Sequence, residues 1–254
     1  MSILATQRRS LIVSHTLYDF LAPSLVQTIR TSRVRQCRRC LSSTSNAPAA
    51  VASDASPNSS KPKKPLSAIQ REFLNRALRV NQAGELAATL IYATQTPPIV
   101  NSHPHLRPLM KHMYDQEAGH FGTFNELLAK HRVRPTAMYP VWTFAASTLG
   151  WGTAIMGREA AMACTEAVET AIGGHYDEQV RELVNMVDEM ERQGEEVGEE
   201  LRELTGTIRR IRDEELEHLD HAVDNDAKEA KPYELLTGVI KAGCKSAIWI
   251  SERV

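Results

Sequence analysis

The sequence has few aromatic residues, 6% of 254, and four cysteines. Cys37 and Cys40 form a Cys-x-x-Cys pair, but a structural zinc site needs a second pair of ligands nearby and none follows, so we expect no zinc there. Cys164 and Cys244 lie in helical patterns, where an unpaired cysteine behaves as a small buried hydrophobe. The cysteines therefore indicate a reducing compartment rather than a disulfide-stabilised protein.

Three further absences narrow the class of protein. No stretch alternates apolar and polar residues between turn signals, so we expect no β-sheet. No Gly-x-Gly-x-x-Gly fingerprint is present, so electrons for any redox reaction must come from outside the chain. Beyond residue 41 the chain has 23 basic and 30 acidic residues, a net charge of −7, which argues against nucleic-acid binding.

Residues 1–41 differ in composition from the rest of the chain. They carry seven arginines and a single acidic residue, Asp19, with apolar clusters between the basic positions. This composition predicts a mitochondrial transit peptide, with a disordered basic tail as the alternative. Residues 42–65 are rich in Ser, Ala, Pro, Asn and Lys without periodicity, so we expect a disordered linker before a folded domain at 66–254.

Helical periodicity fills the predicted domain. Apolar residues recur at steps of three and four, and a Glu or a Glu-x-x-His pair stands within each of four such stripes. The stripes are Leu74, Leu78, Asn81, Glu85, Ala88, Tyr92 and Gln95, expected to stop at Pro97-Pro98; Leu106, Met110, Met113, Glu117, His120, Phe124 and Leu127; Met162, Thr165, Glu169, Ile172, Tyr176, Val180, Leu183 and Val187; and Leu201, Leu204, Ile208, Ile211, Glu215, His218 and Ala222. An acidic turn or solvated face at 188–203 and an apolar helix from 233 to about 250 complete an all-α pattern of five or six helices.

The charged residues on these stripes point to a metal site. In chain order they are Glu85, Glu117 with His120, Glu169, and Glu215 with His218. Burying one ionised carboxylate costs several kcal/mol, and no Lys or Arg lies on the same stripes nearby. Two divalent cations would neutralise four carboxylates, and this carboxylate and imidazole set suits Fe or Mn. The pattern is that of ferritin-like di-metal four-helix bundles.

Other readings of the same residues stay open at this point. Some of these glutamates face solvent if the helices are rotated, and Glu166, Glu214 and Glu217 are then the alternative ligands. Tyr176 lies seven positions after a predicted ligand and shares its face, so it either hydrogen-bonds that ligand or packs in the core. Tyr92 has the same spacing from another predicted ligand and is expected to pack.

Residues 135–157 contain no charged side chain. The run is long enough to span a bilayer, but its glycines and prolines leave only a modest hydrophobic density. We therefore expect a buried or interfacial helix rather than a spanning one.

Several segments of the chain join candidate ligands to other residues in a fixed order. They are Arg79-Val80-Asn81-Gln82-Ala83-Gly84-Glu85, Asp115-Gln116-Glu117-Ala118-Gly119-His120, Phe124-Asn125-Glu126-Leu127, Glu159-Ala160-Ala161-Met162-Ala163-Cys164-Thr165, Arg212-Asp213-Glu214-Glu215-Leu216-Glu217-His218 and Ser251-Glu252-Arg253. With these segments the sequence resembles a known family, the mitochondrial demethoxyubiquinone hydroxylases of coenzyme Q biosynthesis. The resemblance runs from about residue 74 to the C-terminus. Asn81-Gln82 departs from the family's usual Asp-His.

The resemblance implies a di-iron monooxygenase that hydroxylates the ring of demethoxyubiquinone with O₂, in the penultimate step of ubiquinone synthesis. It implies two Fe ions on Glu85, Glu117, His120, Glu169, Glu215 and His218, and a supporting pair at His175 and Tyr176. It also implies NADH as the electron source, and a position on the matrix face of the mitochondrial inner membrane. A polyprenyl quinone substrate, a coenzyme Q biosynthetic complex with a lipid-binding accessory protein, and a possible homo-oligomer complete these expectations.

Two other classes of protein remain compatible with the residues alone. A ferritin-like iron-handling or peroxide-scavenging protein would use the same ligands, but it would not need the long uncharged segment. A non-catalytic helical scaffold would lack iron and tolerate Glu85→Ala and Glu215→Ala. Metal content together with quinone products separates the three.

Overall fold

The computed structural model describes residues 66–254, which fold into α-helices, and no strand occurs in this part of the chain. The predicted transit peptide, the linker and the Cys37–Cys40 pair lie outside the described residues. In chain order the helices are α2 (Ala68–Ser102), α3 (Arg107–His131), α4 (Tyr139–Met156), α5 (Arg158–Arg192), α6 (Glu199–Asp224) and α7 (Tyr233–Ser251). Two single-turn 3₁₀ helices, η2 (Pro104–Leu106) and η3 (Ala227–Glu229), lie in the connections.

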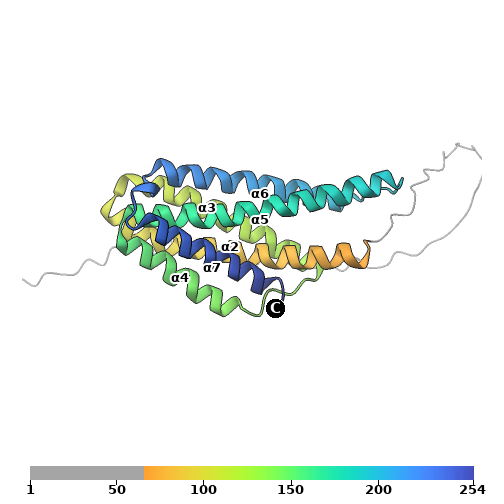
Figure 1. Ribbon diagram of the computed structural model, residues 1–254, viewed down its shortest axis with the longest axis horizontal. Helices are drawn as coiled ribbons and strands as arrows, with labels where there is room; N and C mark the ends of the chain where they lie inside the picture. Colours follow the sequence, from red (N-terminus) through yellow and green to blue (C-terminus); the bar gives the residue numbers. More distant parts are fainter. Residues whose placement is uncertain (1–65) are drawn as a thin grey trace, which may run out of the picture. The chain divides into compact units, whose positions relative to one another are not determined.

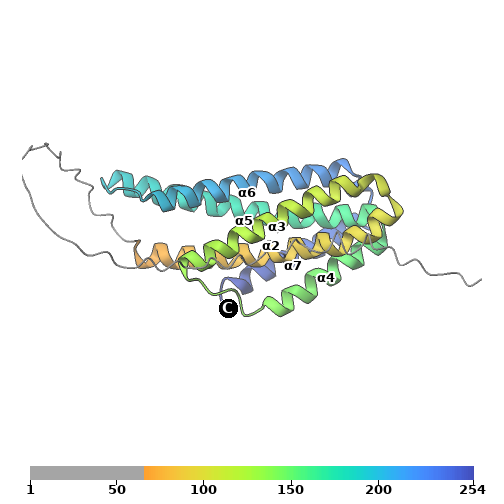
Figure 2. The same cartoon turned by 180° about the vertical axis from the view of Figure 1, so that it is seen from behind.

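The bundle is antiparallel and consists of four helices, α2, α3, α5 and α6 (Figure 1). Helix α2 packs against α3, and α5 packs against α6. Helix α4 packs on α2 and α5, and α7 packs on α5 and α2, so these two lie outside the bundle on the same side of it (Figure 2). The prediction of an all-α, ferritin-like four-helix bundle with additional apolar helices is confirmed.

The predicted stripes are the buried faces of the bundle helices. All seven stripe residues of α2 and all seven of α6 are buried. On α3 the stripe ends at buried Leu128, while Leu127 is only partly buried. The acidic segment contains the predicted turn, because α5 ends at Arg192, Gly194 adopts a positive φ of 67°, and α6 begins at Glu199.

The prediction that the first helix stops at Pro97-Pro98 is wrong. Helix α2 continues through both prolines to Ser102. Each proline removes a backbone hydrogen-bond donor, and this destabilisation of the helix can be predicted from the sequence. The packing that offsets the destabilisation cannot be predicted in this way: Ile99 and Val100 are buried in an apolar cluster that also contains Met110.

Helix α4 is buried on one face only. Its buried residues are small, namely Ala146, Gly150, Thr153 and Ala154, whereas large apolar side chains such as Phe144 face outward. Gly150 sets the packing distance, because a Cβ there would lie 2.6 Å from the Ile91 carbonyl oxygen of α2. Within residues 66–254, no helix has the length and apolar content to cross a membrane.

Candidate metal centre

The six predicted ligands converge at the centre of the bundle. Glu85 comes from α2, Glu117 and His120 from α3, Glu169 from α5, and Glu215 and His218 from α6; all six are buried. They form two quartets of potential ligand atoms, and within each quartet these atoms lie within 4.8 Å of one another. One quartet is Glu85, Glu117, His120 and Glu215, and the other is Glu117, Glu169, Glu215 and His218. Glu117 and Glu215 belong to both.

Two apolar clusters enclose this centre along the bundle axis. On α2, Leu78 belongs to one cluster and Tyr92 to the other, with Glu85 between them in the sequence. The same order holds on α3, where Phe124 and Met113 flank the ligand pair. The helical spacing that makes each stripe apolar therefore also places its charged residues in the interior, remote from water.

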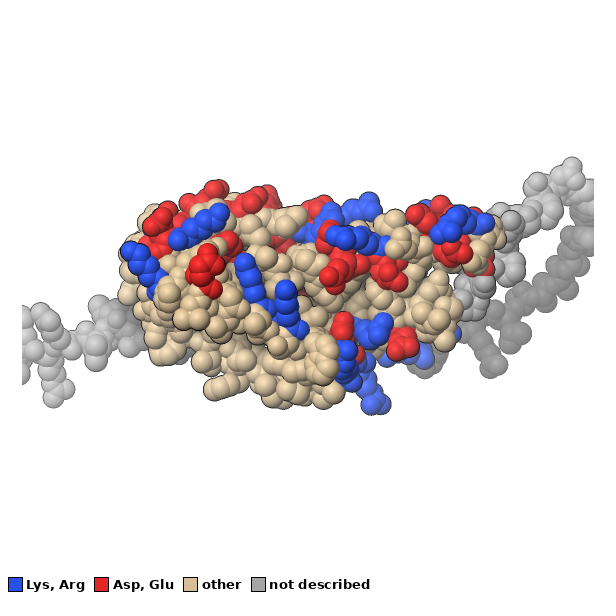
Figure 3. Space-filling model, viewed as in Figure 1, with Lys and Arg blue, Asp and Glu red and all other residues tan. Residues whose placement is uncertain are grey.

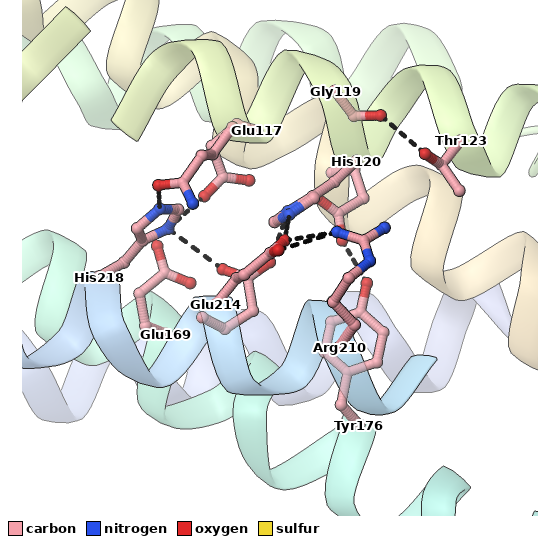
Figure 4. Close-up of polar contacts among 12 residues, drawn as sticks. Glu117, Gly119, His120, Thr123, Glu169, Tyr176, Arg210, Glu214 and His218 are labelled. Atoms are coloured by element: carbon pink, nitrogen blue, oxygen red, sulfur yellow. Dashed lines mark hydrogen bonds and ion pairs between the residues drawn. The ribbon is translucent and has the colours of Figure 1, made fainter. Parts of the chain in front are cut away.

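Each imidazole turns one nitrogen towards the carboxylates. His120 Nδ1 lies 3.1 Å from Glu215 Oε1 and 3.4 Å from Glu85 Oε2. His218 Nδ1 lies 2.8 Å from Glu117 Oε1, although not in hydrogen-bonding geometry, and 3.4 Å from Glu215 Oε2. Both Nδ1 atoms thus face the space that the carboxylate oxygens surround (Figure 4).

Several oxygens in this space have no hydrogen-bond partner among the described residues. They are Glu85 Oε2, both oxygens of Glu117, Glu169 Oε2 and Glu215 Oε2. Buried polar atoms of folded proteins are otherwise nearly always paired. In residues 66–254, no Lys or Arg nitrogen lies within ion-pair distance of these four carboxylates. Their only ion pairs there join Glu85, Glu117 and Glu215 to His120 or His218. The donor set therefore fits two divalent cations, which would supply the missing partners.

The electrostatics of the cluster lead to the same conclusion. Burial, followed by repulsion from Glu215, raises the pKa of Glu117 and of Glu169 well above 4.5. Burial also opposes ionisation of Glu215, but hydrogen bonds from the two imidazoles outweigh it and lower its pKa to about 2. Hydrogen bonds to Glu215 and Glu85 likewise outweigh burial at His120 and raise its pKa to about 11. Without cations, the cluster must hold protons in their place.

Glu85 and Glu169 each belong to only one of the two quartets, and each accepts a hydrogen bond from a tyrosine. The Tyr176 hydroxyl donates to Glu85 Oε1, and the Tyr92 hydroxyl donates to Glu169 Oε1 over 3.2 Å. Tyr92 therefore does more than pack, contrary to expectation. The reason is its position seven residues after Glu85, which carries its ring two turns along α2 to face α5.

The alternative ligands lie elsewhere. Glu166 accepts a hydrogen bond from the Tyr233 hydroxyl (2.7 Å), and Glu217 is exposed. Glu214 does not join a quartet, but its Oε2 lies 2.6 Å from His120 Nε2. Likewise, Gln116 Oε1 lies 3.0 Å from His218 Nε2. Sequence reasoning missed both contacts, although each partner immediately precedes a predicted ligand glutamate.

His175 lies beside the centre rather than in it. Its Nε2 is 2.7 Å from Gln179 Nε2, and Gln179 exchanges two 2.8 Å hydrogen bonds with Asn81. Burial lowers the pKa of His175, so the imidazole is favoured in its neutral form. Gln82, next to Asn81 in the sequence, donates to Asn125 Oδ1 over 3.1 Å.

An apolar cavity of about 370 Å³ lies between the bundle and helices α4 and α7, and it extends inward as far as Tyr176. Trp142 and Leu149 of α4 and Ile240 and Cys244 of α7 contribute to its wall. Tyr176 also lines it, so the residue that hydrogen-bonds Glu85 is the link between cavity and carboxylates.

Comparison with known proteins identifies the family. The family model described as "Ubiquinone biosynthesis protein COQ7" matches residues 72–251. The chain belongs to this COQ7 family. The match covers all six residues of the cluster and both tyrosines, so the predicted resemblance is confirmed.

Relatives within the COQ7 family carry consistent names. The mitochondrial 5-demethoxyubiquinone hydroxylase of Saccharomyces cerevisiae is 50% identical over 191 residues, 74% of this chain and 82% of that protein. The mitochondrial NADPH-dependent 3-demethoxyubiquinone 3-hydroxylase of Mus musculus is 45% identical over 188 residues, covering 74% and 81%. The 3-demethoxyubiquinol 3-hydroxylase of Rhodospirillum rubrum is 42% identical over 181 residues, covering 71% and 78%.

Proposed function

We propose that this protein is a demethoxyubiquinone hydroxylase of ubiquinone biosynthesis, an O₂-dependent di-iron monooxygenase acting at the penultimate step. The observation that carries the proposal is a pair of Glu/His quartets connected through Tyr176 to an apolar cavity, in a chain of the COQ7 family. A peroxide-scavenging or iron-storing bundle would need the quartets but not the cavity. The cavity therefore favours a large apolar substrate.

The chain's residues divide between two iron positions. Glu85 and His120 would hold one iron, Glu169 and His218 the other, and Glu117 and Glu215 would be shared. When bound, the irons supply the activation of O₂ that the side chains cannot perform. The protein holds the ligands in place, keeps bulk water out of the buried cluster, and offers the quinone ring an apolar site.

Tyr176 lies between the cavity proposed for the substrate and the proposed metal ligand Glu85. Burial and the nearby Glu85 charge raise the pKa of its hydroxyl well above 10, so the oxygen keeps its proton. It donates that proton in a hydrogen bond to Glu85 and orients the carboxylate. His175 lines the same cavity and places an imidazole where the ring of a substrate would lie.

Electrons come from an external donor in this proposal. The sequence resemblance implies NADH, whereas the names of several relatives, that from Mus musculus among them, specify NADPH. Both nucleotides supply a hydride, so the proposed electron donor is a reduced nicotinamide nucleotide. Comparing the rates with NADH and NADPH separates the two donors.

The proposed location is the matrix face of the mitochondrial inner membrane, with peripheral attachment through α4 and α7. Phe144 and Trp151 of α4 are 75% and 56% exposed, and Val239 and Trp249 of α7 are 64% and 58% exposed. The surface over α4 carries few charged side chains in Figure 3, whereas acidic and basic side chains gather over α6. Exposed apolar patches of this kind are typical of membrane or protein contacts. A polyprenyl quinone could then enter the cavity from the bilayer.

A liposome experiment tests the attachment. The Phe144→Asp/Trp151→Asp variant should float with vesicles of inner-membrane lipids much less than the unaltered protein. Leu216→Asp is the matched control, since Leu216 of α6 is 47% exposed on the charged side of the bundle. Equal flotation of the first variant and the unaltered protein would contradict this location. A lipid-binding accessory protein, a larger biosynthetic complex and a homo-oligomer are proposals that co-purification from mitochondria tests.

The organisation of the N-terminus is also a proposal. The seven arginines of residues 1–41 and the mitochondrial names of the relatives support a transit peptide, followed by a linker at 42–65. N-terminal sequencing of the protein recovered from mitochondria tests this arrangement. A mature protein that retains residues 1–41 would rule it out.

The decisive test of function combines metal analysis with quinone profiling. Purified protein should contain about two Fe per chain. A strain whose only copy carries Glu117→Ala should lose ubiquinone and accumulate demethoxyubiquinone. Normal ubiquinone in that strain would overturn the proposal.

A further inference from the structure

The two proposed metal positions have closely similar carboxylate ligands. The terminal carboxylate of one half, Glu85, accepts a hydrogen bond from Tyr176, and that of the other, Glu169, accepts one from Tyr92. Each half also contains one imidazole and the same two shared carboxylates. Differences between the two metal positions must therefore be sought in what holds the imidazoles.

Each imidazole forms a hydrogen bond with a residue of the other helix of the pair α3 and α6. Glu214 of α6 contacts His120 of α3 over 2.6 Å, and Gln116 of α3 contacts His218 of α6 over 3.0 Å. Each partner immediately precedes a shared carboxylate in the sequence. Both contacts are made to Nε2, and both partner atoms are oxygen acceptors, so Nε2 carries the proton. When a cation replaces the proton on Nδ1, the Nδ1 lone pair faces the cluster as a metal ligand.

The chemistry of the two partners differs. Glu214 offers a carboxylate, which Arg210 fixes with contacts of 2.9 and 2.8 Å to its two oxygens, as Figure 4 shows. Gln116 offers a neutral amide oxygen. A carboxylate acceptor makes a shorter and stronger hydrogen bond than an amide, and it draws more positive charge onto the Nε2 proton. The opposite ring nitrogen then becomes the stronger metal ligand.

We propose that the two metal positions are unequal, and that Glu214 and Gln116 are the positioning residues that make them so. The position of Glu85 and His120 binds a divalent cation more tightly and fills first, and the position of Glu169 and His218 fills second. This inference rests on the proposed di-metal site, but it does not depend on which substrate is hydroxylated.

Single-position variants measure the two affinities separately. Glu169→Ala removes a ligand of the His218 position, and Glu85→Ala removes a ligand of the His120 position. Metal-free protein of each variant is titrated with Co²⁺ under anaerobic conditions, and binding is followed by the visible absorption of Co²⁺. The Glu169→Ala protein should bind Co²⁺ about 10- to 100-fold more tightly than the Glu85→Ala protein. Equal affinities would overturn the inference.

Exchanging the partners tests the cause. In the Glu169→Ala background, Glu214→Gln should weaken Co²⁺ binding about 10- to 100-fold, and in the Glu85→Ala background Gln116→Glu should strengthen it. Glu217→Gln is the matched control, because Glu217 is an exposed glutamate of the same helix, and it should leave both affinities unchanged. Circular dichroism verifies that each variant is folded. If Glu214→Gln had no more effect than Glu217→Gln, Glu214 would not be a positioning residue.

The outcomes separate this inference from the proposed function. Two unequal sites in a protein that does not hydroxylate demethoxyubiquinone would leave the inference standing and remove the function. If the protein hydroxylates demethoxyubiquinone but Glu214→Gln and Gln116→Glu do not change the Co²⁺ affinities differently, the function would stand and the inference would be overturned.

Discussion

The Tyr176 hydroxyl donates a hydrogen bond to Glu85, and the same tyrosine lines the apolar cavity. One side chain therefore contacts both the space offered to a substrate and a carboxylate of the centre. Tyr92 makes a similar contact to Glu169 but is not part of the cavity wall. The two tyrosines form a natural pair for separating the orientation of a ligand from contact with the substrate.

Tyr176→Phe should leave about two metal ions per chain, because the tyrosine is not itself a member of either quartet. It should lower the hydroxylation rate about 10- to 100-fold, since loss of the hydrogen bond frees Glu85 and removes a polar group from the cavity. Tyr92→Phe should cost less, because only ligand orientation is lost. Rates on a short-tailed demethoxyubiquinone and iron content are the measurements. Equal losses in the two variants would show that Tyr176 has no role at the cavity.

The shared carboxylates should differ from the terminal ones in metal stoichiometry. Glu117 belongs to both quartets and Glu169 to one. Glu117→Gln should therefore weaken binding at both positions, whereas Glu169→Gln should leave about one tightly bound metal ion per chain. Metal content after dialysis of the Co²⁺-loaded proteins measures this. Retention of the same metal content in both variants would contradict the shared role of Glu117.

The candidate metal-binding residues could be predicted from the sequence because the buried positions of a helix recur every three or four residues. On α6, the seven residues from Leu201 to Ala222 that step by three and four are all buried, and Glu215 and His218 are two of them. A charged residue at such a position can be recognised without a structure. The order of the four stripes then determines which side chains meet.

The contacts between helices could not be predicted in this way. The hydrogen bonds from His120 to Glu214 and from Tyr92 to Glu169 depend on the rotation and separation of neighbouring helices, which a single-helix pattern does not contain. The continuation of α2 beyond Pro97 has the same origin, since distant packing of Ile99 offsets a local cost. The sequence predicts Glu214 only as an alternative ligand, because it does not show that His120 lies opposite Glu214 across the bundle.

The packing of α4 on α2 should depend on Gly150 and not on Gly152. A Cβ at Gly150 would lie 2.6 Å from the Ile91 carbonyl oxygen and 2.8 Å from the Ile91 Cα, and backbone cannot move aside cheaply. Gly150→Ala should therefore destabilise the fold by about 1–3 kcal/mol. A Cβ at Gly152 meets nothing within 4 Å, so Gly152→Ala should be neutral or slightly stabilising. Thermal unfolding of both variants provides the comparison, and equal melting temperatures would contradict the close approach.

The stability of the metal-free protein should fall as the pH rises. The pKa values of Glu117 and Glu169 are raised by burial and by repulsion within the cluster, and that of His120 is raised to about 11 by hydrogen bonds to carboxylates. Above pH 4.5 for the glutamates, and above 6.5 for the histidine, the folded state then binds more protons than the unfolded state. The free energy of unfolding decreases with pH over such a window.

Metal-free protein should accordingly melt at a lower temperature at about pH 8 than at about pH 5. Protein loaded with Co²⁺ should lose this decrease or reverse it, because the cations replace the protons and bind more tightly once the ligands are deprotonated. Glu117→Gln should reduce the slope in the metal-free protein, since it removes one carboxyl whose pKa is raised. Melting curves across this pH range, with and without Co²⁺, measure these differences. A metal-free protein that became more stable towards pH 8 would mean that the buried carboxylates are not held protonated by their neighbours.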